Sequence, residues 1–118
     1  MFARRFSLQR TEFTKIKQDS QLYQSTNFGV LIRRRAGTEN PRFGIIISNK
    51  VSKLATHRNR VRRAFRDALR RNWKKVDNNI DMVFLIKPGI EKVLVSDIMK
   101  EIEAFLNSKE YEKDDSKN

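Results

Sequence analysis

Seven of the fourteen residues from 58 to 71 are arginines, yet the same stretch carries a complete apolar helix face. The segment "THRNRVRRAFRDALRR" begins at Thr56, and its apolar positions recur at spacings of three, one, three, one and four residues. Those spacings are typical of one face of an α-helix. The apolar positions are Val61, Ala64, Phe65, Ala68, Leu69 and Trp73. We therefore predict a helix over 57–73 that packs this face on a sheet, with Thr56 as its N-cap.

The arginines of this helix are electrostatically unfavourable on their own. Four are spaced by four residues and form one stripe with a fifth beside them, namely Arg58, Arg62, Arg66, Arg70 and Arg63. Like charges at this spacing cost about 0.2–0.5 kcal/mol per pair, and the first of them oppose the helix dipole. The only acid is Asp67, expected opposite Arg63 and Arg71. A bound phosphate would turn both unfavourable interactions into favourable ones, because guanidinium groups bind phosphate in a forked geometry. The alternative is a solvated charged face.

Positive charge is concentrated in the first 75 residues of this 118-residue chain. They hold 20 Lys/Arg and 4 Asp/Glu, which gives a charge of +16. Residues 76–118 hold 6 Lys/Arg and 10 Asp/Glu, which gives −4, so the net charge of the chain is +12. This excess favours nucleic acid as the partner, then an anionic membrane surface, then no partner at all. The chain has no cysteine, no apolar run long enough to span a membrane and no apparent secretory signal, so we expect a cytoplasmic protein.

The rest of the chain predicts one domain over 1–107. The expected elements are, in order, a helix over 11–19, strands over 28–35 and 42–50, the arginine-rich helix, a strand over 80–87 and a helix from Ser96. The segment "AGTENP" (36–41) has the length of a hairpin connection. A further short strand is expected near 48–54. The polar tail, 108–118, is expected to be disordered.

Groups that could catalyse a reaction are sparse. His57 is the only histidine, and the four acids of the basic region are scattered: Glu12, Asp19, Glu39 and Asp67. The other ten acids lie after residue 75, largely at positions that look exposed. There is no phosphate-binding glycine loop. We therefore expect no catalytic residue and no bound metal or cofactor, although distant carboxylates could still converge on a metal in the folded chain.

The segment "NKVSKLATHRNRVRRAFRDALR" (49–70) resembles the signature of the bacterial ribonuclease P protein component. Its centre is "RNR", Arg58-Asn59-Arg60, followed by the basic pair Arg62-Arg63. The segments "EFTKI" (12–16), "FGVLI" (28–32), "RFGIIIS" (42–48) and "DMVFLIKPG" (81–89) are similar to the family in the same order. The resemblance therefore covers nearly the whole chain.

The resemblance implies an α+β domain with an N-terminal helix, a four-stranded sheet and a C-terminal helix. It implies that the signature helix lies in a left-handed crossover between parallel strands, which periodicity alone cannot show. The implied function is to assist a catalytic RNA that cleaves the 5′ leader from precursor tRNA, with the RNA holding the magnesium ions. The expected partners are that RNA and precursor tRNA, with neither DNA nor a membrane.

The resemblance also assigns site residues by position. The RNA-binding residues expected from it are Lys50, Arg58, Asn59, Arg60, Arg62, Arg63 and Arg66, and the helical spacing of the arginine stripe adds Arg70. Phe13 and Lys17 are expected to border the leader cleft, where an aromatic ring can stack on bases of any sequence. Phe13 has an alternative role as a core residue beside Ile16.

Three positions depart from the family pattern. Lys17 stands where a second aromatic is frequent, Asn49 where a lysine is common, and Leu31 where some members have tyrosine. Lys17 puts the aromatic half of the cleft in question. Two rival hypotheses stay open: a structural RNA-binding protein, such as a ribosomal component, and a nuclease with its own active site.

Overall fold

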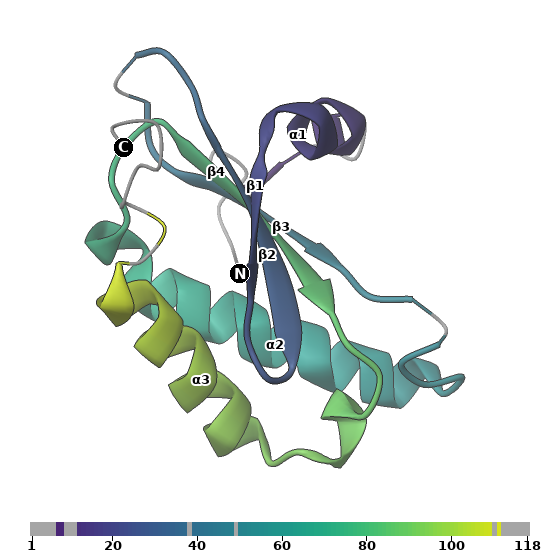
Figure 1. The fold of residues 1–118 in the computed structure, drawn as a ribbon. Helices are drawn as coiled ribbons and strands as arrows, with labels where there is room; N and C mark the ends of the chain where they lie inside the picture. The colour runs from purple at the N-terminus through teal and green to yellow at the C-terminus, as the bar shows by residue number, and fades with distance from the viewer. Residues whose placement is uncertain (1–6, 9–11, 38, 49, 110, 112–118) are drawn as a thin grey trace.

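A four-stranded sheet separates one short helix from two longer ones (Figure 1). The computed structural model describes residues 7–8, 12–37, 39–48, 50–109 and 111. Its elements are α1 (Phe13–Asp19), β1 (Gln21–Gln24), β2 (Phe28–Arg34), β3 (Arg42–Ile46), α2 (Ala55–Asn72), β4 (Ile80–Ile86) and α3 (Val95–Ser108), with 3-10 turns at Trp73–Lys75 and Ile90–Lys92. Helices α2 and α3 cover one face of the sheet and α1 lies on the other (Figure 1). This is the α+β domain that the resemblance implied.

The strand order is β1-β2-β4-β3, so β4 lies between β2 and β3, which are consecutive in the chain. Strand β4 is antiparallel to β2 and parallel to β3. Although the segment 36–41 has the length of a hairpin loop, β2 and β3 are not paired. The reason lies in β4, which is buried at all but one of its positions and therefore needs a neighbour on each edge and cover on each face. Helix α2 thus forms a crossover between parallel strands, as expected.

The fourth strand of the sheet is β1, which the sequence interpretation placed elsewhere. We expected a short strand near 48–54, but the described residues of that segment form turns and irregular backbone, and α2 begins just after it at Ala55. Strand β1 follows α1 directly and is mostly exposed at the edge of the sheet. Its sequence, "QLYQ", has only two apolar residues, so its pairing with β2 decides its conformation more than its own pattern does.

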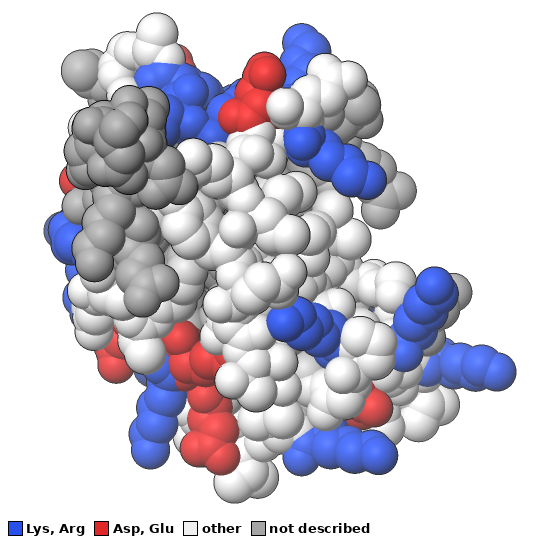
Figure 2. All heavy atoms as spheres, in the orientation of Figure 1, with Lys and Arg blue, Asp and Glu red and all other residues white. Residues whose placement is uncertain are grey.

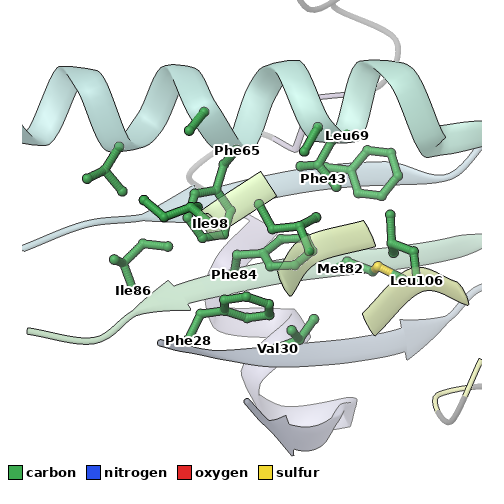
Figure 3. Packing of buried hydrophobic residues seen from close by; sticks show 14 of the residues in the cluster. Phe28, Val30, Phe43, Phe65, Leu69, Met82, Phe84, Ile86, Ile98 and Leu106 are labelled. Carbon is green, nitrogen blue, oxygen red and sulfur yellow. The ribbon is translucent and has the colours of Figure 1, made fainter. Parts of the chain in front are cut away.

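The main core lies between the sheet and the helix pair α2 and α3 (Figure 3). Rings of Phe28, Phe65 and Phe84 meet edge to face with centroids 5.5–5.6 Å apart. The apolar face predicted for α2 is buried from Val61 to Leu69, whereas Trp73 is only half-buried and packs at the margin. Burial of one such side chain contributes about 1.5–3 kcal/mol, which explains why α2 folds despite its arginines.

The N-terminal end of α2 and the C-terminal part of the chain differ in detail from the prediction. Thr56 is not the N-cap of α2, because the helix begins at Ala55 with Leu54 as the capping residue and no side-chain cap. The Leu54 carbonyl instead accepts the first helical hydrogen bonds, from the N–H groups of His57 and Arg58.

At the C-terminus, Ser108 still belongs to α3. Tyr111, which we expected in a disordered tail, is buried against Phe105. Residues 110 and 112–118 lie outside the described part, and the proposed limit of the domain at residue 107 stays a prediction.

Candidate nucleic-acid interface

Two adjoining cavities follow the outer edge of β3. One, of about 160 Å³, is lined by Ser7, Leu8, Phe13, Phe43, Gly44, Ile45, Arg62 and Arg66. The other, of about 450 Å³, is lined by Ile45, Asn59, Arg62, Arg63 and Arg66. Because they share Ile45, Arg62 and Arg66, we treat them as one basic groove between α1 and α2. Figure 2 shows this side of the molecule hollowed, with Lys and Arg side chains on both rims.

The α2 wall of the basic groove is a group of cations that have no acidic partner among the described residues. Asn59 accepts a 3.2 Å hydrogen bond from Arg62. Within the described residues, no carboxylate lies within 4.0 Å of a guanidinium nitrogen of Arg62, Arg63 or Arg66. Partial burial, together with the charges of Arg66 and Arg58, lowers the pKa of Arg62. The wall is therefore suited to bind an anion of extended shape, such as a nucleic-acid backbone.

The opposite wall is formed by α1 together with Ser7 and Leu8. Phe13 is half-buried, with its ring against Gly44 and one side toward the groove. Ile16, one turn later, is fully buried with Leu8 and Val83 in a second apolar cluster. Phe13 packs against the margin of this cluster and also lines the groove, so its position is compatible with both roles proposed for it. Lys17 is exposed in the last turn of α1 and does not line the groove.

The predicted stripe of arginines along α2 divides into separate environments. Arg58 donates a 2.7 Å hydrogen bond to the Ser52 carbonyl, and Arg60 donates to the Glu91 carbonyl. Arg70 forms a 3.1 Å ion pair with Asp67, the acid that we expected opposite Arg63 and Arg71.

Other predicted positions also lie outside the groove lining. Lys50 is exposed in the turn before α2. Leu31 packs at the margin of the second apolar cluster, and Asn49 lies outside the described residues. The structure therefore brings together Phe13, Asn59, Arg62, Arg63 and Arg66 of the predicted site residues.

A second group of arginines surrounds Asp81, which the sequence interpretation placed among the exposed acids. Asp81 is wholly buried in β4. Its cross-strand neighbours are Arg33 in β2 and Arg42 in β3. Its carboxylate accepts hydrogen bonds of 2.7 Å from Arg33, 2.7 Å from Arg35, and 3.0 Å from each of two nitrogens of Arg42. Two further carboxylates complete what we call the Asp81 cluster: Glu12, paired with Arg42, and Glu39, paired with Arg35.

The charge state of Asp81 follows from these contacts. Burial alone would raise its pKa, but hydrogen bonds from Arg42 and Arg33 and the charge of Arg35 outweigh burial and lower the pKa. The same hydrogen bonds raise the pKa of Arg42. The signal for this cluster is present in the sequence: an acid inside the apolar run "IDMVFLIK" requires cationic partners, and three consecutive arginines occupy 33–35.

Clusters of metal-ligating side chains are absent from the part of the chain that the structure describes. Within that part, no three His, Asp or Glu side chains lie close enough to hold a metal ion. His57 Nδ1 lies 3.2 Å from the Ser52 hydroxyl oxygen. No described helix is long and apolar enough to cross a membrane.

Comparison with known proteins identifies the family. The family model described as Ribonuclease P matches residues 2–110. A ribonuclease P protein component from Fusobacterium nucleatum is 36% identical over 88 residues, which is 70% of this chain and 78% of that protein. A second, from Pseudoalteromonas translucida, is 32% identical over 66% of this chain and 55% of that protein. The chain thus matches between about half and four fifths of the length of these relatives.

Solved structures agree with this assignment at the level of the fold. The ribonuclease P protein of Staphylococcus aureus superposes with a TM-score of 0.80 over 89% of this chain and 95% of that chain, at 18% identity. The ribonuclease P protein of Thermotoga maritima superposes with a TM-score of 0.74 over 82% of this chain and 92% of that chain, at 25% identity. The chain belongs to the family of bacterial ribonuclease P protein components.

Proposed function

We propose that this chain is the protein subunit of ribonuclease P, which binds the catalytic RNA and the 5′ leader of precursor tRNA and so assists removal of the leader. One observation carries the proposal: within one concave surface, the basic groove joins an aromatic ring to three arginines for which the described residues supply no acidic partner. Family membership supports the same function. We propose that the RNA holds the magnesium ions and performs the cleavage, and that the complex works in the cytoplasm.

The two walls of the groove suit different parts of RNA. Arg62, Arg63 and Arg66 present forked donors that fit phosphate oxygens, and their mutual repulsion falls when an anion binds. Phe13 offers a ring on which a base can stack, and such stacking tolerates any base. A subunit that serves many precursor tRNAs needs contacts of this sequence-independent kind. We propose that Lys50, Arg58 and Asn59 extend the RNA contact around the start of α2.

Reconstitution tests this function. The chain is combined with a bacterial ribonuclease P RNA, and cleavage of a leader-bearing precursor tRNA is measured at near-physiological magnesium. We expect faster cleavage than with the RNA alone and no cleavage by the protein alone. The Arg62→Ala/Arg66→Ala double variant is expected to lose most of the gain. No gain with the wild-type protein would contradict the proposal.

The structural RNA-binding alternative makes a different prediction. A ribosomal component has no reason to favour a leader, so its complex with RNA should bind precursor and mature tRNA equally. We expect the reconstituted complex to bind the leader-bearing precursor more tightly. A nuclease with its own site would instead lose activity when one particular acidic residue is replaced by alanine.

A further inference from the structure

Helix α1 is too short to fix its own position. It has seven residues, and isolated helices of that length are unstable in water. Ile16 anchors its inner side in the second apolar cluster. Two further contacts tie its N-terminal end to β3: an ion pair from Glu12 to Arg42 and the packing of the Phe13 ring on Gly44. These contacts determine where Phe13 stands at the basic groove.

The first contact connects α1 to a cation of the sheet that is itself hydrogen-bonded to the buried Asp81. The two oxygens of Glu12 lie 3.2 and 3.0 Å from nitrogens of Arg42. Arg42 is itself fixed by two 3.0 Å hydrogen bonds to Asp81, whose side chain is wholly buried. Glu12 precedes α1 as its N-cap residue but makes no capping hydrogen bond. Its interaction with Arg42 is therefore its main structural contribution.

The second contact is a close approach that only glycine permits. A Cβ atom added at Gly44 would lie 2.8 Å from Cε1 and 2.9 Å from Cζ of Phe13, well inside van der Waals contact. The backbone of β3 is paired with β4 on one side and accepts a hydrogen bond from Leu8 on the other. Because the strand is held on both sides, the tip of the Phe13 ring has to move off the sheet when a methyl group is added.

We propose that Glu12, Arg42 and Gly44 are positioning residues for Phe13. They hold the tip of its ring against Gly44 and so set its place opposite the arginines of α2. The proposal rests on the function proposed above, because it assigns to this placement the recognition of the precursor leader. It adds that the Asp81 cluster, none of whose residues lines the basic groove, influences that recognition through Glu12 and the position of α1.

A double-mutant cycle tests the link between Gly44 and Phe13. The measured quantity is the ratio of the affinities of the reconstituted holoenzyme for leader-bearing precursor tRNA and mature tRNA. We expect Phe13→Ala to lower this ratio about fivefold or more, the loss of one base stack. Gly44→Ala should lower it about threefold or more when Phe13 is present. In the Phe13→Ala background, Gly44→Ala should have no further effect.

Matched controls separate positioning from general damage. Gly29→Ala makes the same substitution in β2, where the added Cβ would meet only atoms at 3.4 Å or more, and should leave the ratio unchanged. Glu12→Ala and Glu39→Ala each remove one carboxylate from the Asp81 cluster, but Glu39 is not paired with β3 or α1. We expect only Glu12→Ala to lower the ratio. Circular dichroism melting confirms that each variant folds.

A measurement on the free protein keeps this proposal separable from the proposed function. In phenylalanine-labelled protein, the Phe13 ring signals, assigned with Phe13→Leu, should shift in Gly44→Ala and not in Gly29→Ala. Unshifted signals would overturn the positioning role. So would shifted signals with an unchanged affinity ratio. If the wild-type holoenzyme showed no preference for the precursor, the proposed function would fail, while shifted signals would still support the contact.

Discussion

The molecule uses arginine in two opposite ways. Arg33, Arg35 and Arg42 converge on the buried carboxylate of Asp81 and are largely shielded from solvent. Arg62 and Arg66 line an open groove, and no acid within the described residues lies within ion-pair distance of them. The first group has its acidic partner within the protein, whereas we propose that an external anion is the partner of the second. Net charge therefore misleads as a guide to the binding surface, because part of it stabilises the fold.

The largest expected effect comes from removing the acid at the centre of the Asp81 cluster. Asp81→Ala leaves three partly buried guanidinium groups without their shared partner, and we expect a loss of about 3–5 kcal/mol in the free energy of unfolding. Urea denaturation measures this loss. Asp67→Ala, which removes an acid from the exposed Arg70 pair, serves as the control and should cost less than about 1 kcal/mol. Equal losses would abolish the distinction between the two groups of arginines.

The pH dependence of stability sharpens the same comparison. Because folding lowers the pKa of Asp81, its ionised form stabilises the protein fully above the unfolded-state pKa of about 3.9. That stabilisation disappears as the pH falls through the lower pKa of the folded state. The difference in stability between wild-type protein and Asp81→Asn should therefore be constant from neutral pH to about 5 and shrink below about 4. A difference that grew on acidification would contradict the assignment.

Sulfate should distinguish the groove from the Asp81 cluster. An anion that binds the folded state stabilises it by mass action, and about ten times the dissociation constant adds roughly 1.4 kcal/mol. We expect sulfate to raise the melting temperature of the wild-type protein by several degrees more than that of Arg62→Ala/Arg66→Ala. Arg71→Ala is the matched control for general salt effects, because Arg71 lies on the α3 side of α2. An equal rise in all three proteins would indicate no specific anion site.

The smallest expected effect is on the stability of the free protein. Replacing both Arg62 and Arg66 removes like-charge repulsion together with some packing of their alkyl chains. We expect the free energy of unfolding in urea to change by less than about 0.5 kcal/mol. Arg42→Ala, in contrast, should destabilise the protein clearly. A large loss in the double variant would mean that these arginines stabilise the fold rather than serve a partner.

The sequence predicts the elements of the fold better than their arrangement. The apolar face of α2 and the buried strand β4 follow from local patterns, and both are confirmed. Strand β1 was missed because "QLYQ" has a weak pattern of its own, so that pairing with β2 decides its conformation. The placement of β4 between β2 and β3 depends on packing of the whole domain, which no local spacing records.

The candidate site shows the same division between local and long-range information. Spacing along α2 predicts which arginines share a helix side, but not what lies opposite each one. Arg58 reaches the Ser52 carbonyl and Arg70 pairs with Asp67, so Arg62 and Arg66 are the members of the stripe that line the groove. The Asp81 cluster was missed because it unites three strands whose register only the fold determines. The apposition of Phe13 and Gly44 has the same origin.

The salt dependence of RNA affinity tests the central claim most directly. The equilibrium constant for binding ribonuclease P RNA is measured across a range of salt concentrations for wild-type protein, Arg62→Ala/Arg66→Ala and Arg71→Ala. Each lost phosphate contact lowers the log–log slope by about 0.7–0.9, so the double variant should lose about 1.4–1.8. Arg71→Ala should change the slope little. An unchanged slope in the double variant, or as steep a loss in Arg71→Ala, would contradict the role assigned to the basic groove.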